Sequence, residues 1–286
     1  MLRTLNIFML LILNVGKGSK MKYNKITILL KYILYLIKAS NGRGHGIHSP
    51  FVFSFIKKVL NTTTKGDWVN NIENYRAEVL NNKQEIKMVD LGAGAILQTN
   101  KTKKISIIAR GSLKSKKYST LLNRIVAYYR PSNVLEMGTS FGITTCYLAQ
   151  AMPGGAVVTM EGAPAIAKEA LHTFSTLGFS NIQLLEGNFD NSLPLYFNTI
   201  STIGFAYVDG NHSYEPTMRY FNLLLNKSNQ DSIFIFDDIH WSREMEMAWK
   251  EIKEDQRVSL TIDLFYIGIV FLKKENKEKE NFIIRF

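Results

Sequence analysis

The sequence predicts an α/β fold with a doubly wound, mostly parallel sheet that follows a helical extension. The first observation is the alternation of short apolar runs with amphipathic segments from residue 116 onward. Such alternation is typical of parallel strands joined by covering helices. The second observation is an apolar run that leads into Gly138 and Gly142 and then into a helical segment. A strand, a glycine loop and a helix in this order form a ligand-binding edge in such sheets.

Residues 1–40 form a basic, apolar extension with apolar runs at 5–15 and 26–37. Both runs are shorter than the roughly 18–20 residues of a membrane-spanning helix. The first run is signal-like but lacks a small-residue cleavage site, and Met21 is an alternative start of the chain. The second run predicts a helix packed on the rest of the protein, or alternatively a helix lying on a membrane.

Residues 41–115 are interpreted as a lead-in of helices and loops. A glycine-rich loop ends at Pro50, a helical segment follows over 51–60, and residues 61–87 are polar and weakly patterned. Residues 116–286 form the main domain. Its first helix follows the apolar spacing over 118–129 and stops before a proline.

The elements of the main domain follow in order after that helix. The helix expected over 164–177 begins at a proline, Pro164, and ends before a glycine, Gly178. Two alternating apolar runs near the C-terminus, 258–264 and 266–272, predict an antiparallel hairpin at one edge of the sheet. After a first strand from residue 133, we expect strands at 156–161, 181–186, 203–209 and 232–238, helices at 143–152, 164–177, 216–226 and 242–253, and an added edge strand at 282–286.

Positive charge is concentrated at the N-terminal end of the chain. The net charge is +11, and residues 1–66 hold eleven of the 35 Lys and Arg and no acid. The rest of the chain therefore holds 24 basic and 24 acidic residues, so its charges balance. We expect no nucleic-acid partner for the main domain, whereas the extension suits an anionic membrane surface or an acidic partner. The single cysteine, Cys146, excludes an internal disulfide and suits the cytoplasm.

Two segments match a nucleotide-binding loop, one at 88–95 and one at 133–142. Asp90, Gly92 and Gly94 give the better match in isolation, but no amphipathic helix and no second strand ending in an acid follow them. The 133–142 loop has both. Its spacing of acid-x-Gly-x-x-x-Gly differs from the dinucleotide pattern and indicates S-adenosylmethionine rather than NAD. Asp90 is interpreted as a turn residue, with a role on the substrate side as the alternative.

The candidate cofactor residues stand at the carboxyl ends of the expected strands, where ligands bind in such sheets. Glu161 lies 23 residues after Gly138, near the spacing at which an acid binds the ribose hydroxyls. Asn188 and Phe189 offer a polar side chain and a ring that could bracket an adenine. The candidate set is Glu136, Gly138, Thr139, Ser140, Gly142, Glu161, Gly162, Gly187, Asn188, Phe189 and Asp209.

Three carboxylates follow the last two parallel strands. Asp237 and Asp238 are adjacent, and a cation would relieve the repulsion between them. With Asp209 they form an oxygen-rich set that suits Mg²⁺. The alternative is that the adjacent pair caps the helix that begins near residue 242. His240 is interpreted as a structural loop histidine.

On these residues, the segment 133–272 resembles class I S-adenosylmethionine-dependent methyltransferases with a Rossmann-like fold, in particular the caffeoyl-CoA, catechol and macrocin O-methyltransferase branches. The resemblance implies that Asp209, Asp237 and Asp238 bind Mg²⁺. It places His212 where the catechol branch has a lysine base, and the run 209–215 is similar to the macrocin-like loop.

The resemblance therefore implies a Mg²⁺-assisted O-methyltransferase for a small hydroxylated molecule, with His212 and Asp209 as catalytic residues. Mg²⁺ would lower the pKa of the acceptor hydroxyl, and His212 would take its proton near neutral pH. One alternative is a metal-independent methyltransferase with a nitrogen or other acceptor. Another is a membrane-associated nucleotide-binding protein without catalysis. We also expect a homodimer. The expected location is the cytoplasm, with peripheral membrane contact through residues 1–40.

Overall fold

The computed structural model describes residues 22–87, 102–273 and 278–286. The apolar run 5–15 and the loop at 90–94 lie outside the described residues.

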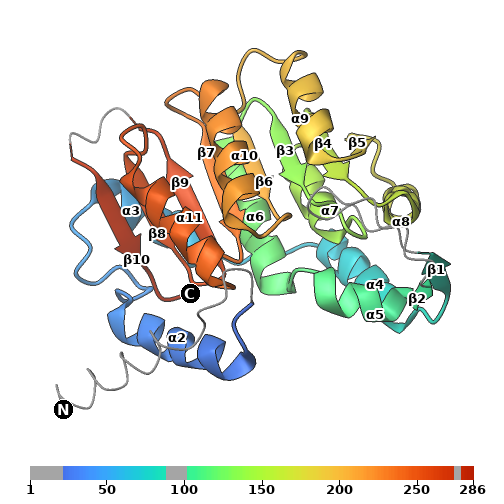
Figure 1. The fold of residues 1–286 in the computed structure, drawn as a ribbon, viewed down its shortest axis with the longest axis horizontal. Helices are drawn as coiled ribbons and strands as arrows, with labels where there is room; N and C mark the ends of the chain where they lie inside the picture. The colour runs from blue at the N-terminus through green and yellow to red at the C-terminus, as the bar shows by residue number, and fades with distance from the viewer. Residues whose placement is uncertain (1–21, 88–101, 274–277) are drawn as a thin grey trace.

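A mostly parallel sheet forms the centre of the molecule (Figure 1). Within the described residues it has eight strands in the order β10-β8-β9-β7-β6-β3-β4-β5. The strands are β3 (Val134–Met137), β4 (Val157–Glu161), β5 (Ile182–Glu186), β6 (Phe205–Val208), β7 (Ile233–Asp237), β8 (Leu260–Asp263), β9 (Ile267–Phe271) and β10 (Glu280–Ile283). Strands β3 to β7 are parallel, and β9 is antiparallel to both β7 and β8. The α/β fold and its antiparallel hairpin are confirmed; β10, parallel to β8, forms the edge beyond the hairpin.

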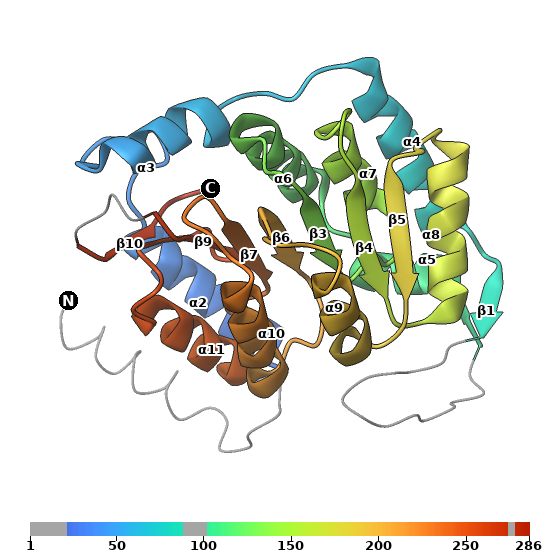
Figure 2. The same cartoon turned by 90° about the horizontal axis from the view of Figure 1, so that it is seen from above.

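Helices cover both faces of this sheet (Figure 2). One face carries α6 (Lys116–Tyr129) and α7 (Ile143–Gln150), and the other carries α9 (Phe189–Phe197), α10 (Tyr214–Asn226) and α11 (Arg243–Glu254). Helix α8 (Pro164–Thr176) lies beside β5. Successive strand residues belong to opposite cores, for example Phe205 on the α6 side and Ala206 on the α10 side. Burial on both faces explains why the strands are continuously apolar.

The strand order places a switch point at the centre of the sheet. The chain runs from β3 outward through β4 to β5, and β6 then pairs with the opposite side of β3. At such a point the connections leave in opposite directions, and a crevice opens beyond the carboxyl ends of the strands. The fold therefore directs a ligand to the ends of β3 and β6.

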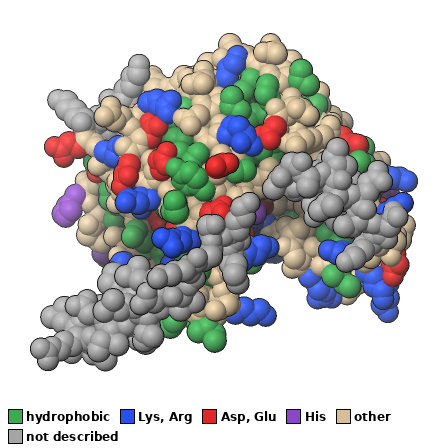
Figure 3. All heavy atoms as spheres, viewed as in Figure 1, with side chains coloured by type: hydrophobic (Ala, Val, Ile, Leu, Met, Phe, Trp, Pro, Cys, Tyr) green, Lys and Arg blue, Asp and Glu red, His purple; other side chains and the backbone are tan. Residues whose placement is uncertain are grey.

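The lead-in contains more strand structure than the sequence predicts. Besides α3 (Pro50–Phe55), η1 (Ile56–Leu60), α4 (Asp67–Asn81) and α5 (Ile105–Ser112), it has a two-stranded antiparallel sheet of β1 (Glu85–Lys87) and β2 (Thr102–Lys104). These short strands are polar and mostly exposed, so they lack the apolar alternation that marks a strand. Figure 3 shows Lys and Arg side chains around the β1–β2 sheet and α5. Exposed basic residues of this part are Lys83, Lys87, Lys103, Lys104 and Arg110.

Helix α2 (Lys25–Lys38) packs on the body with one face only. Its Tyr35 packs with Phe265, and its Lys31 pairs with Glu246 of α11 at 2.9 Å. The opposite face is an exposed apolar stripe of Ile26, Leu29, Ile33 and Ile37, at 71%, 57%, 45% and 67% exposure. In the described part of the chain, none of the helices combines the length and the apolar character needed to cross a bilayer.

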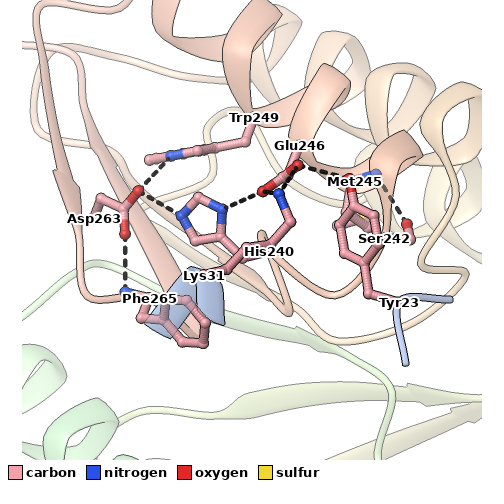
Figure 4. Close-up of polar contacts among 9 residues, drawn as sticks. All are labelled: Tyr23, Lys31, His240, Ser242, Met245, Glu246, Trp249, Asp263 and Phe265. Atoms are coloured by element: carbon pink, nitrogen blue, oxygen red, sulfur yellow. Dashed lines mark hydrogen bonds and ion pairs between the residues drawn. The ribbon is translucent and has the colours of Figure 1, made fainter. Parts of the chain in front are cut away.

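His240 belongs to a half-buried charge network in which Glu246 joins α2 to the body (Figure 4). Its Nδ1 lies 3.1 Å from Glu246 Oε1, and its Nε2 lies 2.8 Å from Asp263 Oδ2. Glu246 also accepts hydrogen bonds from the Tyr23 hydroxyl at 2.8 Å and from Lys31 at 2.9 Å. Burial alone would lower the pKa of His240, but the two carboxylates raise it to about 9. These contacts agree with a structural role for His240.

This network makes stability depend on pH. A histidine whose pKa is raised by folding contributes stability below its unfolded pKa of about 6.5, and that contribution is lost as pH rises through about 9. We expect the free energy of unfolding to fall by up to ~3 kcal/mol over this window. Denaturant unfolding at several pH values measures the loss. His240→Gln should make the fall in stability with pH shallower, and His172→Gln, at an exposed position on α8, should leave it unchanged; an unchanged fall in the first variant would contradict the assignment.

Candidate functional site

A cavity of about 1040 Å³ opens at the carboxyl ends of the parallel strands. Its size suits a small-molecule site. The sequence-predicted residues that line it are Gly138, Ser140, Glu161, Gly162, Gly187, Asn188, Phe189, Asp209, His212, Asp237 and Asp238. Trp241, Tyr266 and Lys114 also line it, whereas the remaining candidates, Glu136, Thr139 and Gly142, do not. The residues predicted from separate strands therefore share one cavity.

Glycine is required where the loop after β3 meets the end of β6. Gly138 has φ 111°, and a Cβ on it would lie 2.1 Å from the carbonyl oxygen of Asp209. Gly142 has φ 76°, and a Cβ there would lie 2.4 Å from the Phe174 ring. No other residue fits these positions without moving its neighbours. The loop therefore packs directly against the backbone that carries Asp209.

Glu161 ties the glycine loop to the end of β4. Its Oε2 accepts from the Ser140 N–H at 2.9 Å, and its Oε1 accepts from the Ala163 N–H at 2.9 Å. Burial raises its pKa although these hydrogen bonds lower it. Each carboxylate oxygen has a second lone pair, so Glu161 can also accept hydrogen bonds from a ligand in the cavity. This arrangement fits the hydroxyls of a ribose.

The end of β5 supplies a flat apolar wall. Asn188 caps α9, with its side chain accepting from the Asp190 N–H at 3.0 Å. A Cβ on Gly210 would lie 2.6 Å from the ring of Phe189, so the ring packs closely on the backbone after β6. Helix α9 was not predicted from the sequence, because Asp190 and Pro194 interrupt the helical pattern.

Glu136 lies beneath the loop and outside the cavity lining. It is fully buried, and its Oε2 accepts from Thr145 and from Thr159, the latter at 2.7 Å. Its Oε1 has no partner among the described residues. Burial raises the pKa of Glu136 to about 8, against the lowering effect of the two threonines. The carboxyl is therefore largely protonated near neutral pH.

Asp209, His212 and Asp237 converge at the ends of β6 and β7. One candidate ligand atom from each lies within 4.8 Å of the others. His212 Nε2 is 3.4 Å from Asp209 Oδ1, and the Tyr207 hydroxyl donates to Asp209 Oδ2 at 2.9 Å. Burial alone would lower the pKa of His212, but Asp209, Asp237 and Asp238 raise it. His212 is thus oriented by Asp209 and faces the cavity.

Asp238 lines the cavity but does not belong to this converging group. It does not cap α11 either, because the Ser242 side chain accepts from the Met245 N–H at 3.1 Å. The capping alternative for the adjacent aspartates is therefore wrong. Trp241 also lines the cavity, whereas the Tyr214 hydroxyl binds Glu251. His45 and His48 are exposed and do not line the cavity.

A lysine that sequence analysis missed enters the acidic cluster. Lys114, between α5 and α6, lines the cavity and pairs through Nζ with Asp237, which is only 1% exposed. Burial alone would lower the pKa of Lys114, but Asp237, Asp209 and Asp238 raise it, so it stays an ammonium. Burial would in turn raise the pKa of Asp209, but Lys114 and His212 hold it well below its usual range. No motif surrounds Lys114, so the sequence offered no signal for it.

The position of Lys114 is fixed from the lead-in. The buried Arg76 of α4 donates through Nη1 to the Lys114 carbonyl, and its Nε donates to Glu73 at 3.0 Å. Glu73 also accepts from the Tyr147 hydroxyl of α7 at 2.8 Å. The loop that carries the lysine is therefore attached to the helix that follows the glycine loop.

Lys114 competes with a divalent cation for this cluster, although the buried Asp237 Oδ1 has no partner among the described residues. The reason to expect Mg²⁺ was the repulsion between carboxylates, and the ammonium of Lys114 offsets part of it at Asp237, whose pKa burial and Asp209 still raise. A metal ion at Asp237 would lie beside that ammonium, which repels it and offers no lone pair. The Mg²⁺ set of Asp209, Asp237 and Asp238 therefore differs from what the structure brings together.

The comparisons with known proteins agree with the fold. The family model described as "Methyltransferase domain" matches residues 135–239, which contain the glycine loop, Glu161 and the acidic cluster. No curated protein sequence matches the chain.

Solved methyltransferases share the fold. The O-methyltransferase from Bacillus cereus in complex with SAH has a TM-score of 0.52 at 18% identity, over 77% of this chain and 97% of that one. SAH-bound PaMTH1 from Podospora anserina has a TM-score of 0.55 at 13% identity, over 90% and 100%. The O-methyltransferase TomG from Streptomyces achromogenes, involved in tomaymycin synthesis and solved with SAM, has a TM-score of 0.52 at 15% identity, over 78% and 95%. Residues 135–239 of this chain therefore hold a methyltransferase domain, built on the fold that these methyltransferases share.

Glu161 and Glu136 should differ in their importance for cofactor binding. We expect Glu161→Gln to weaken S-adenosylmethionine binding about 10- to 100-fold, because a hydrogen bond to a charged partner contributes roughly 1.5–3 kcal/mol. Glu136→Gln should change the affinity less than about threefold, since that carboxyl is largely protonated and outside the cavity lining. Calorimetric titration measures both. A large loss in the Glu136 variant would instead support the sequence-based placement of Glu136 at the cofactor.

Proposed function

We propose that the protein is an O-methyltransferase for a small hydroxylated acceptor and that it works without a divalent cation. The observation that carries the proposal is the placement of His212, oriented by Asp209, in the same cavity as the glycine loop and Glu161. A base beside a methyl-donor site is the arrangement that methylation of a hydroxyl requires.

Bound S-adenosylmethionine supplies a methyl group on a sulfonium, which the acceptor oxygen takes as the carbon–sulfur bond breaks and its electron pair stays on sulfur. His212 in its neutral form accepts the acceptor's hydroxyl proton, and Asp209 stabilises the imidazolium that results. Trp241 and Tyr266 line the cavity and reduce the access of water. Positioning supplies much of the rate enhancement in such transfers.

A nitrogen acceptor is the second candidate. An acceptor amine would be held by the buried carboxylates of the cluster, but Lys114 already pairs with Asp237. The hydroxylated acceptor is therefore the better fit, and identification of the methylated atom in the product distinguishes the two.

The rate should depend on the protonation of His212. Because neighbouring carboxylates raise its pKa, kcat/KM should increase with pH through a value above the ordinary histidine pKa of about 6.5. We expect His212→Gln to lose about 100-fold in kcat/KM and to lose this pH limb. Radiolabelled methyl transfer to a panel of phenols and sugars measures both effects, with His172→Gln as the control. Full activity in the His212 variant would reject it as the base.

We also propose that residues 22–40 lie on an anionic membrane surface. The exposed apolar stripe of α2 supports this, because lysines at both ends of the helix, Lys25 and Lys38, are exposed beside it. In Figure 1 the helix lies at the outside of the body.

Vesicle co-sedimentation tests this contact. The wild type should bind phosphatidylglycerol vesicles more than phosphatidylcholine vesicles, and the double change Ile26→Asn with Ile33→Asn should reduce binding about tenfold or more. Leu171→Asn, at an exposed apolar position of α8, is the matched control. Equal binding by all variants, or a dimer in sedimentation that the stripe variant dissociates without vesicle binding, would contradict the membrane contact.

A further inference from the structure

We infer that Lys114 is a built-in cation that takes the place of a divalent metal and donates a hydrogen bond to the reacting oxygen of the acceptor. The inference deepens the proposed O-methyl transfer and rests on it. It concerns a residue outside the segment that matches the methyltransferase domain, which begins at residue 135.

The geometry of the cluster supports this role. Lys114 reaches Asp237 at the end of β7 and also lines the cavity, so its ammonium lies between buried carboxylates and the space for the acceptor. An ammonium has three N–H donors, and Asp237 takes one of them. The others can serve Asp209 and an acceptor oxygen. His212, paired with Asp209, lines the same cavity.

The loop that carries Lys114 is fixed by buried contacts. Arg76, 7% exposed, binds the Lys114 carbonyl and is itself held by Glu73 and by the Ser119 hydroxyl at 3.3 Å. A surface lysine that met the carboxylates by chance would not need this support. A buried arginine that binds the Lys114 carbonyl while Glu73 and Ser119 hold it in place fixes the position of this loop.

The chemistry that follows is electrostatic. As the acceptor loses its proton to His212, negative charge develops on its oxygen, and a charge-assisted hydrogen bond from the Lys114 ammonium stabilises that charge. Lys114 keeps its proton throughout, and His212 later releases the acceptor's proton to solvent. The ammonium therefore lowers the pKa of the acceptor hydroxyl in the way a bound metal ion does.

The inference predicts how the cluster behaves toward a metal. With Lys114 present, Mg²⁺ alone should show no binding to the wild-type protein in calorimetric titration. Lys114→Met keeps much of the side-chain length and removes the charge, so Asp209, Asp237 and His212 are left without the competing ammonium. This variant should gain Mg²⁺ binding, and Lys116→Met, an exposed lysine two residues away, should not.

Activity supplies the second readout. The wild type should keep its rate in excess EDTA, and Lys114→Met should lose about 100-fold in kcat/KM while S-adenosylmethionine affinity changes less than about threefold. Lys114→Cys permits chemical rescue because the one natural cysteine, Cys146, is buried. Treatment with 2-bromoethylamine restores an ammonium and should restore activity, whereas iodoacetamide adds an uncharged group of similar size and should not.

Several results would overturn the inference: Mg²⁺ binding by the wild type, loss of its activity in EDTA, full activity in folded Lys114→Met, or no gain of Mg²⁺ binding by that variant. Circular dichroism and cofactor titration show whether each variant is folded. If the wild type binds S-adenosylmethionine but methylates no hydroxylated acceptor, the proposed function fails, and the metal titrations still decide whether Lys114 replaces the cation.

Discussion

The charge balance of the carboxylates at the ends of β6 and β7, of which Asp237 is fully buried, is the constraint on which the site depends. Two carboxylates cannot stay ionised out of water without a nearby positive charge, because an uncompensated buried charge costs several kcal/mol. Burial and Asp209 raise the pKa of Asp237, and Lys114 opposes this rise. The same lysine holds Asp209 ionised, and an ionised Asp209 is what orients His212. The state of the proposed base therefore depends on a residue outside the sheet.

The N-terminal segments gain a structural meaning from this dependence. Arg76 of α4 fixes the loop that delivers Lys114, and α2 supports the other side of the cavity. The N–H of Tyr23, just before α2, donates to the Trp241 carbonyl at 3.1 Å, and Trp241 lines the cavity. Tyr32 of α2 lies beside Tyr266, with 6.3 Å between ring centroids. The segments before the methyltransferase domain thus shape the part of the cavity that an acceptor would occupy.

The sheet could be predicted from the sequence because burial on both faces produces unbroken apolar runs, and the strand ends then follow from topology. Glu161 and Asp209 could be located for the same reason, since each follows such a run directly. Helix α9 could not be predicted, because Pro194 interrupts its helical pattern. The β1–β2 sheet could not be predicted either, because its strands are polar and mostly exposed. Lys114 could not be found either. Its importance arises from a contact across 123 positions of the chain, and local sequence carries no trace of such a contact.

Because a lysine distant in sequence can reach the carboxylates, an acidic motif in this fold does not by itself predict a bound metal ion. Acids after neighbouring parallel strands show that positive charge is needed at one edge of the sheet, but they do not show which cation supplies it. A metal ion satisfies the need, and so does a lysine delivered by any segment that packs over that edge. In this protein the lysine comes from the lead-in, which lies outside the motifs at the strand ends. Whether the acidic cluster binds Mg²⁺ is therefore decided by residues such as Arg76, which never touch the carboxylates but determine whether Lys114 reaches them.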